Sequence, residues 1–350
     1  MLAGSRSRSL AALSLAIVVA LLLAACRPLP GSSGGPTPIP TRTLTKLSVG
    51  LGYLPSVQFA PFYLAQRAGY YEGAGLEVTF QNKIDPDLIT LVGQGELDLG
   101  VADGTSVIPA VSQGIPIRYT ATIYGTYPSI VFAKASSGIT SAGDLRGRKI
   151  GIPGRYGSSW IMLQALLDSV GLTPDDVTID LYPEFGQGVA LQQGAVHAAT
   201  GFVNNEPVQL EISGEEAVVL HVDDVVALPG PGLIAGKATI DAKAEALATF
   251  NSVTLRAMRE IAADPAAGLE AAIAAVPELA TDRATQAQVL DATIATWAPP
   301  GGSVDDFMSI DRAGWQASID YLTELGLVPN PVTVDELVQG LVNGPLTGPS

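Results

Sequence analysis

Residues 47–80 read LSVGLGYLPSVQFAPFYLAQRAGYYEGAGLEVTF and contain an apolar run, a helical pattern and an alternating run, in that order. The runs at 47–51 and 76–80 are typical of strands, and residues 62–69 between them have the spacing of a short amphipathic helix. The series continues with another helix and another strand as far as Val101. Strands that alternate with helices predict an α/β fold with an open, largely parallel sheet.

A second series of the same kind begins at residue 149, after a further strand pattern at 116–123. From residue 241 onward the chain is rich in alanine and helical in pattern. Two α/β units and a helical tail predict two lobes. Because ligands bind beyond the carboxyl ends of the strands in such sheets, we expect a cleft between the lobes and functional residues just after the strands. The second series comprises strand patterns at 149–152, 177–182, 198–203 and 218–222 and helical patterns at 158–170 and 189–193.

The N-terminus has the pattern of a bacterial lipoprotein. A short basic region precedes an apolar stretch at residues 10–23, which is short for a membrane span and typical of a signal peptide. The stretch ends in Leu-Ala-Ala-Cys at Cys26, the only cysteine of the chain. We expect a signal peptide over 1–25, cleavage before Cys26 and acylation of that cysteine. The alternative is an ordinary secreted protein with an incidental cysteine.

Residues 26–43 are rich in Pro, Gly, Ser and Thr and predict a flexible spacer between a lipid anchor and a folded part that begins near Leu44. The protein is therefore expected at the cell membrane, facing outside the cytoplasm. The formal net charge of −15 argues against nucleic acid as a partner. With only His197 and His221, a histidine-rich metal site is excluded, and we expect no metal and no cofactor.

Candidate ligand contacts in the first lobe follow two strands. Tyr53 and Gln58 offer an aromatic face and an amide, a combination that can hold a flat ring and read one polar edge. Phe59 is expected to pack the following helix instead. Asp103 and Thr105 follow the next strand, where they can bind a ligand or cap a helix, and both interpretations stay open.

Candidates in the second lobe follow its strands. Tyr156 adds an aromatic face, and Ser158 begins a helix whose N-terminus can hold an anion or a carbonyl. Asn205 and Glu206 supply donors and acceptors, although an Asn-rich turn before a helix is the alternative. Weaker candidates are Glu184, Phe185 and the segment 124–127. The expected ligand-binding residues are Tyr53, Gln58, Asp103, Thr105, Tyr127, Tyr156, Ser158, Asn205 and Glu206.

Three segments carry a family resemblance: GYLPSVQFAPFYLA with the residues after it (52–78), LVGQGELDLG (91–100) and DLRGRKIG (144–151). They resemble thiamine-pyrimidine-synthase-like proteins and sulfonate- or nitrate-binding proteins. The resemblance runs from Leu44 to about Trp297. It implies a type II periplasmic-binding fold, with a ligand cleft between two lobes. The implied first lobe is 44–130 plus the C-terminal helices of 229–345, and the implied second lobe is 131–228.

The resemblance also implies the role of a solute-binding component that serves an ABC permease and its ATPase. Substrates known in the family include sulfonates, nitrate, thiamine-pyrimidine precursors and riboflavin. Small anions need positive groups, of which the candidate loops supply only Arg155, whereas their aromatic residues favour a planar heterocycle. The segments 53–63 and 204–207 also resemble riboflavin-binding relatives, so we expect riboflavin first, a thiamine-pyrimidine precursor second and a sulfonate third. The alternative is a pyrimidine-synthesising enzyme, whose iron, histidine and cysteine-rich motif the chain does not match.

Overall fold

The structure is a computed structural model that describes residues 43–84, 87–223 and 225–342. The expected signal peptide, Cys26 and the spacer up to residue 42 lie outside the described residues. The part from Leu44 onward forms one compact unit. Within the described ranges, no helix combines the length and the apolar character needed to cross a membrane.

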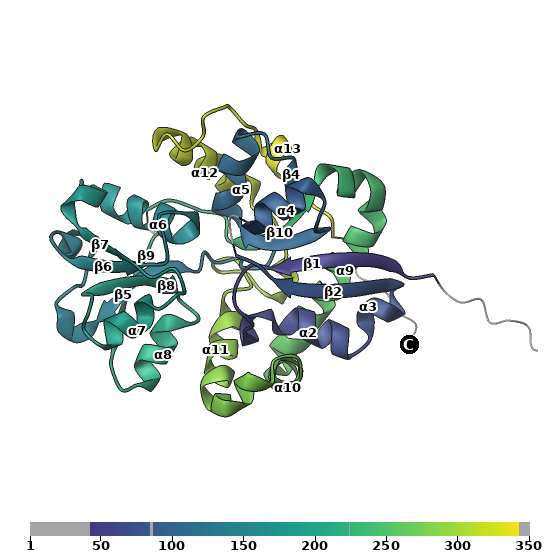
Figure 1. Ribbon diagram of the computed structural model, residues 1–350, viewed down its shortest axis with the longest axis horizontal. Helices are drawn as coiled ribbons and strands as arrows, with labels where there is room; N and C mark the ends of the chain where they lie inside the picture. The colour runs from purple at the N-terminus through teal and green to yellow at the C-terminus, as the bar shows by residue number, and fades with distance from the viewer. Residues whose placement is uncertain (1–42, 85–86, 224, 343–350) are drawn as a thin grey trace, which may run out of the picture. The chain divides into compact units, whose positions relative to one another are not determined.

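The first sheet has the strand order β2-β1-β3-β10-β4 (Figure 1). Strand β1 is parallel to β2 and β3, whereas β10 is antiparallel to both β3 and β4. The chain therefore leaves this sheet after β4, builds the second sheet, and returns to insert β10 between β3 and β4. The strands are β1 (Thr45–Leu51), β2 (Leu76–Asn82), β3 (Leu99–Asp103), β4 (Ile117–Thr122) and β10 (Pro231–Gly236).

The second sheet repeats this arrangement with the order β7-β6-β8-β5-β9. Strand β6 is parallel to β7 and β8, and β5 is antiparallel to β8 and β9. The carboxyl ends of the central strands of both sheets therefore carry the loops in which ligand contacts were expected. The strands are β5 (Ser129–Lys134), β6 (Lys149–Ile152), β7 (Thr178–Leu181), β8 (Ala198–Phe202) and β9 (Ala217–His221).

The prediction of a largely parallel sheet is confirmed, because all strands but β10 in the first sheet and β5 in the second run in the same direction; the sequence pattern did not predict these two antiparallel strands. Both strands are almost completely buried, so they lack the alternation that marks a strand with one solvated face. Strand β10 also begins with Pro231 and Gly232, which usually indicate a turn. The other predicted strands occur close to their expected positions.

Helices cover both sheets. The α-helices packed around the first sheet are α2 (Ala60–Arg67), α3 (Tyr70–Gly73), α4 (Asp87–Gln94), α5 (Gly104–Ser112), α9 (Lys237–Ala263), α10 (Pro265–Ala275), α11 (Arg283–Ala295), α12 (Arg312–Glu324) and α13 (Val334–Leu337). Those around the second sheet are α6 (Gly157–Asp168), α7 (Gln187–Gln192) and α8 (Glu206–Ile212). The short 3₁₀ helices are η1 (Val57–Phe59), η2 (Ala135–Ser137), η3 (Ala142–Leu145), η4 (Pro174–Asp176), η5 (Pro277–Asp282) and η6 (Val304–Asp306).

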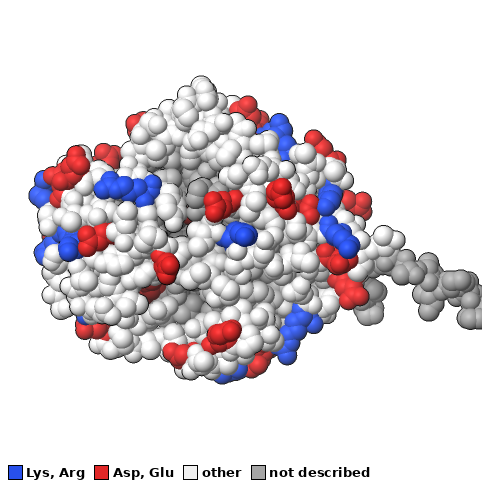
Figure 2. Space-filling model, viewed as in Figure 1, with Lys and Arg blue, Asp and Glu red and all other residues white. Residues whose placement is uncertain are grey.

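The core of the first lobe contains a stack of aromatic rings. The ring of Phe250 in α9 stacks on Tyr71 at 5.0 Å and on Phe62 at 6.1 Å. This packing fixes α2, and therefore the loop before it, against the sheet. The charged side chains lie outside this core, and Figure 2 shows Lys, Arg, Asp and Glu interspersed over the face in view, without a patch of one sign.

Candidate functional site

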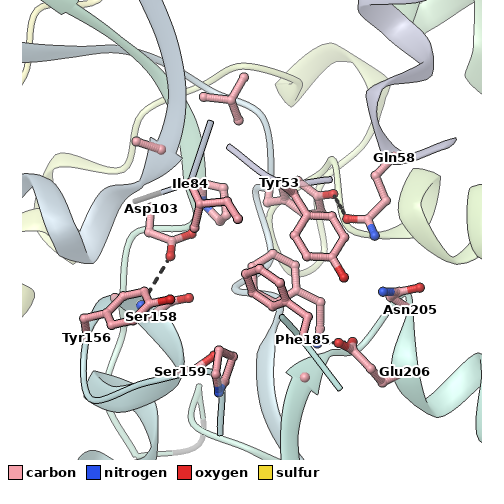
Figure 3. A pocket seen from close by; sticks show the side chains of 18 of the residues that line it. Tyr53, Gln58, Ile84, Asp103, Tyr156, Ser158, Ser159, Phe185, Asn205 and Glu206 are labelled. Atoms are coloured by element: carbon pink, nitrogen blue, oxygen red, sulfur yellow. Dashed lines mark hydrogen bonds between the residues drawn. The ribbon is translucent and has the colours of Figure 1, made fainter. Parts of the chain in front are cut away.

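A pocket lies where loops from the carboxyl ends of strands in both sheets meet (Figure 3). Its empty space, counting the part open to solvent, is about 840 Å³. Both predicted lobes contribute. The lining residues are Tyr53, Gln58, Phe59, Ile84, Val101, Ala102, Asp103, Tyr124, Pro153, Tyr156, Gly157, Ser158, Ser159, Phe185, Gln187, Gly201, Phe202, Asn205, Glu206 and Pro231.

An aromatic pair joins the two sides of the pocket. Tyr53, which follows β1, meets Phe185, which precedes α7, edge to face with ring centroids 4.8 Å apart. Burial, and then the Glu206 carboxylate, raise the pKa of Tyr53 above its usual value, while a hydrogen bond with Asn205 opposes the rise. The phenol therefore stays protonated at neutral pH, and its hydroxyl points toward Asn205 (Figure 3).

Gln58 is held by the local fold of the loop after β1. The hydroxyl of Ser56 caps η1 by accepting a hydrogen bond from the Gln58 N–H at 3.3 Å. The buried side-chain oxygen Oε1 of Gln58 accepts from the Tyr124 hydroxyl at 3.0 Å. Because that oxygen is occupied, the amide nitrogen is the group that Gln58 offers to the pocket (Figure 3).

Asp103, the last residue of β3 in the first sheet, forms a hydrogen bond with a residue on the side of the second sheet. Its Oδ2 accepts a hydrogen bond from the Ser158 N–H, in the first turn of α6, at 3.2 Å (Figure 3). Burial raises the pKa of Asp103, and the hydrogen bonds from Ser158 oppose that rise. The helix N-terminus predicted to hold a ligand anion or carbonyl therefore holds a carboxylate of the protein itself.

Ser158 is fixed on its other sides as well. Its Oγ accepts from the Ser129 hydroxyl at 3.3 Å, and its carbonyl oxygen accepts from the Tyr127 hydroxyl at 3.4 Å. Tyr156, just before α6, stays partly exposed at the pocket, and its ring covers Gly154, where a Cβ would lie 2.2 Å from the ring atom Cε1. A side chain at Gly154 would therefore displace Tyr156.

Glu206 closes the loop after β8. Its Oε2 accepts from the Phe202 N–H at 2.8 Å, and burial raises its pKa to about 7. Near neutral pH the Glu206 carboxyl is therefore partly protonated, when it can donate a hydrogen bond, and partly ionised, when it can only accept one. Asn205 Oδ1 accepts from the Gln209 side chain at 2.7 Å, so the NH₂ group is the part of Asn205 that faces Tyr53 and the pocket. Helix α8 begins at Glu206 itself, with Pro207 in its first turn, so the turn and helix of the alternative interpretation are present beside the pocket.

Two expected contacts, Thr105 and Tyr127, do not line this pocket. Helix α5 begins directly at Gly104, so Thr105 already lies inside it and is completely buried. Tyr127 belongs to the segment that crosses to the second sheet. Tyr124 faces the pocket, whereas Tyr127, three residues later, is packed with Leu228 and lines another cavity with Trp315.

Phe202, Gln187 and Phe185 also line the pocket, although the sequence patterns indicate them weakly or not at all. Phe202 was counted inside a predicted strand, and it is the last residue of β8. Gln187 is almost fully buried and donates from Nε2 to the Thr200 carbonyl at 3.1 Å. Phe185 follows β7, so the strand-end rule indicated it, but only as a weaker candidate.

Phe185 has a left-handed backbone with φ of 59°. This conformation costs a residue with a Cβ roughly 1–2 kcal/mol and costs glycine almost nothing. We therefore expect Phe185→Gly to be more stable than Phe185→Ala by about 1 kcal/mol, although both lose the ring. Denaturant unfolding of the two variants measures the difference. Equal stabilities would contradict a left-handed Phe185.

The charge of the pocket is one-sided. Among the described residues that line it, none is Lys, Arg or His, whereas Asp103 and Glu206 carry carboxyl groups. The guanidinium of Arg155, the expected cation, lies 5.0 Å from the ring centroid of Trp160 and lines a different cavity. The six aromatic side chains in the lining are Tyr53, Phe59, Tyr124, Tyr156, Phe185 and Phe202. This combination suits an uncharged planar ring.

The histidines lie away from the pocket. His197 Nδ1 accepts from the Lys149 N–H at 2.9 Å, and His221 is the exposed last residue of β9. Among the residues that the structure describes, no group of three or more His, Cys, Asp and Glu side chains is placed to hold a metal ion.

Comparison with known proteins assigns the chain to a family. The model of the NMT1/THI5-like family matches residues 56–268, about three fifths of the chain. The chain belongs to the NMT1/THI5-like family. Over 335 residues it is 32% identical to the riboflavin-binding protein RibY of Chloroflexus aurantiacus, which covers 93% of this chain and 95% of that protein. The predicted family is thereby confirmed.

Other members of the NMT1/THI5-like family are more distant. The 4-amino-5-hydroxymethyl-2-methylpyrimidine phosphate synthase of Legionella pneumophila is 26% identical over 187 residues, which cover 53% of this chain and 58% of that enzyme. The match therefore spans only part of the enzyme.

Solved structures confirm the periplasmic-binding-protein fold. The aliphatic sulphonate binding protein SsuA of Escherichia coli superposes with a TM-score of 0.68 at 17% identity, over 84% of this chain and 97% of that chain. The alkanesulfonate-binding SsuA of Xanthomonas axonopodis pv. citri gives a TM-score of 0.67 at 17% identity, over 85% and 98%. These likenesses concern the fold alone.

Proposed function

We propose that this protein captures riboflavin outside the cytoplasm and delivers it to an ABC permease. The observation that carries the proposal is the pocket between the two sheets, with its aromatic lining, its amides and its lack of a cationic side chain. The 32% identity to a riboflavin-binding protein over 93% of the chain supports the same ligand.

The polar groups of the pocket suit the edge of a flavin ring. That edge presents an imide N–H between two carbonyl oxygens. The amide nitrogens of Gln58 and Asn205 are donors for carbonyl oxygens, and the Glu206 carboxylate is an acceptor for the N–H. The aromatic residues would cover the faces of the ring, and the Tyr53–Phe185 contact would open to admit it.

The lipid anchor completes the proposed role. Acylated Cys26 would hold the protein on the outer face of the membrane, and residues 27–43 would give it reach toward the permease. The permease and its ATPase would move the ligand inward, so no covalent chemistry by this chain is required.

A fluorescence titration tests the ligand. Riboflavin added to the purified protein should show saturable one-to-one quenching at submicromolar concentration, because the ring would stack on aromatic side chains. A riboflavin signal that does not change over the titration would contradict riboflavin as the ligand.

A thiamine-pyrimidine precursor is the second candidate, favoured by the family model and by the synthase relatives. It too is a planar heterocycle without negative charge. The enzymatic alternative, a pyrimidine synthase, has less support, because the chemistry of such a synthase needs histidines and a cysteine-rich motif. Both histidines of this chain lie outside the pocket, and its one cysteine is Cys26.

A further inference from the structure

Helix α6 is the element that would bind an anion best in this site. It has twelve residues, and its N-terminal turn opens at the pocket through Gly157, Ser158 and Ser159. The first-turn N–H groups of a helix and its dipole attract negative charge. A phosphate or sulfonate group on a ligand would therefore be expected here first.

The protein's own carboxylate already occupies this place. Asp103 Oδ2 lies 3.2 Å from the Ser158 nitrogen, and 3.6 Å from the point where a Cβ on Gly157 would be. Gly157 has a positive φ of 64° and no side chain, which lets the carboxylate approach the helix end closely. Asp103 belongs to the other sheet, so the contact also joins the two sides of the pocket.

No other group of the pocket offsets this negative charge. Glu206 supplies a second carboxyl group, and the part of the lining that the structure describes contains no Lys, Arg or His. An anionic ligand would have to displace Asp103 from α6 or lie beside two carboxylates without a counter-ion. Both alternatives are unfavourable, because like charges repel more strongly at a protein surface than in bulk water.

We propose that the pocket rejects ligands that carry a phosphate or sulfonate group, and that Asp103 is the residue that determines this specificity. The inference deepens the proposed function, on which it rests for the neutral ligand. The protein would distinguish riboflavin from riboflavin monophosphate, although the two share the same ring.

Paired ligands test the proposal at pH 8, where Glu206, with a pKa of about 7, is mostly ionised. The pairs are riboflavin with its monophosphate, and 4-amino-5-hydroxymethyl-2-methylpyrimidine with its phosphate. Dissociation constants are measured by calorimetry for the wild type, for Asp103→Asn and for Asp175→Asn. The asparagine at 103 keeps an acceptor for the Ser158 N–H, and Asp175 is an exposed carboxylate of the second lobe that serves as the charge-matched control.

We expect the wild type to bind riboflavin at least about a hundredfold more tightly than its monophosphate. Asp103→Asn should reduce that ratio about tenfold or more, and Asp175→Asn should leave it unchanged. Equal binding of riboflavin and its monophosphate would overturn this inference and leave the proposed function intact. If riboflavin failed to bind and 4-amino-5-hydroxymethyl-2-methylpyrimidine still bound more tightly than its phosphate, riboflavin would be rejected as the ligand and this inference would be supported. A ratio that Asp103→Asn does not change would remove Asp103 as the determinant.

Discussion

Replacing Tyr53 with alanine should weaken riboflavin binding roughly 30-fold, which corresponds to about 2 kcal/mol. The ring of Tyr53 is the aromatic surface that the first lobe presents to Phe185 across the pocket. Its removal would leave one face of the bound flavin without a stacking partner. Titration of riboflavin fluorescence measures the loss directly.

Two further variants separate the ring of Tyr53 from its hydroxyl and from general damage. Tyr53→Phe keeps the ring and removes only the group that points toward Asn205, so most of the affinity should remain. Tyr321→Ala removes a partly buried tyrosine that is outside the pocket and should bind riboflavin as the wild type does. If Tyr53→Ala also bound normally, Tyr53 would not contact the ligand.

Glu206 should make the folded protein less stable as the pH rises toward neutrality. Its pKa is about 7 when folded, against 4.5 for an unperturbed glutamate, because burial disfavours the charged form. Between these values the folded state holds a proton that the unfolded state has released, so the free energy of unfolding falls with rising pH. The full shift corresponds to about 3 kcal/mol.

The comparison of wild type with Glu206→Gln isolates this contribution. The variant cannot ionise, so it should gain stability relative to the wild type as the pH rises from about 4.5 to above 7. Denaturant unfolding at pH 4.5, 6 and 8 measures this trend. Glu211→Gln, on the exposed face of the same helix, should show no comparable trend. A constant difference between Glu206→Gln and wild type at all three pH values would show that Glu206 titrates normally.

Most of the pocket could be predicted because strand ends can be found in a sequence. Tyr53, Asp103, Tyr156 and Glu206 each lie a few residues after or before a short apolar run, and the structure brings all four to one pocket. The backbone position follows from the periodicity and from the rule that parallel strands present their carboxyl ends together. The orientation of a side chain does not follow: Tyr124 lines both this pocket and the neighbouring cavity, whereas Tyr127, three residues later, lines the neighbouring cavity but not this pocket.

The contacts between the two sheets could not be predicted. The hydrogen bond from Ser158 to Asp103 joins residues far apart in the chain, and no local pattern encodes their distance. The strands β5 and β10 were missed because they are buried on both faces and lack the alternation that marks a strand. Each of these features depends on tertiary packing.

The position of β10 also orders the assembly of the chain. Pairing of Gly232 with Ala102 and with Thr122 fills the gap between β3 and β4, so those two strands have no common partner until residue 231 has been made or translocated. The second sheet, by contrast, is contiguous from Ser129 to His221 and needs nothing that comes later. Contacts so distant in sequence form slowly. A chain emerging from the export machinery would therefore complete the second sheet first, before the first sheet that surrounds it in the sequence. A truncation before β10 would leave the facing edges of β3 and β4 unpaired and open to aggregation.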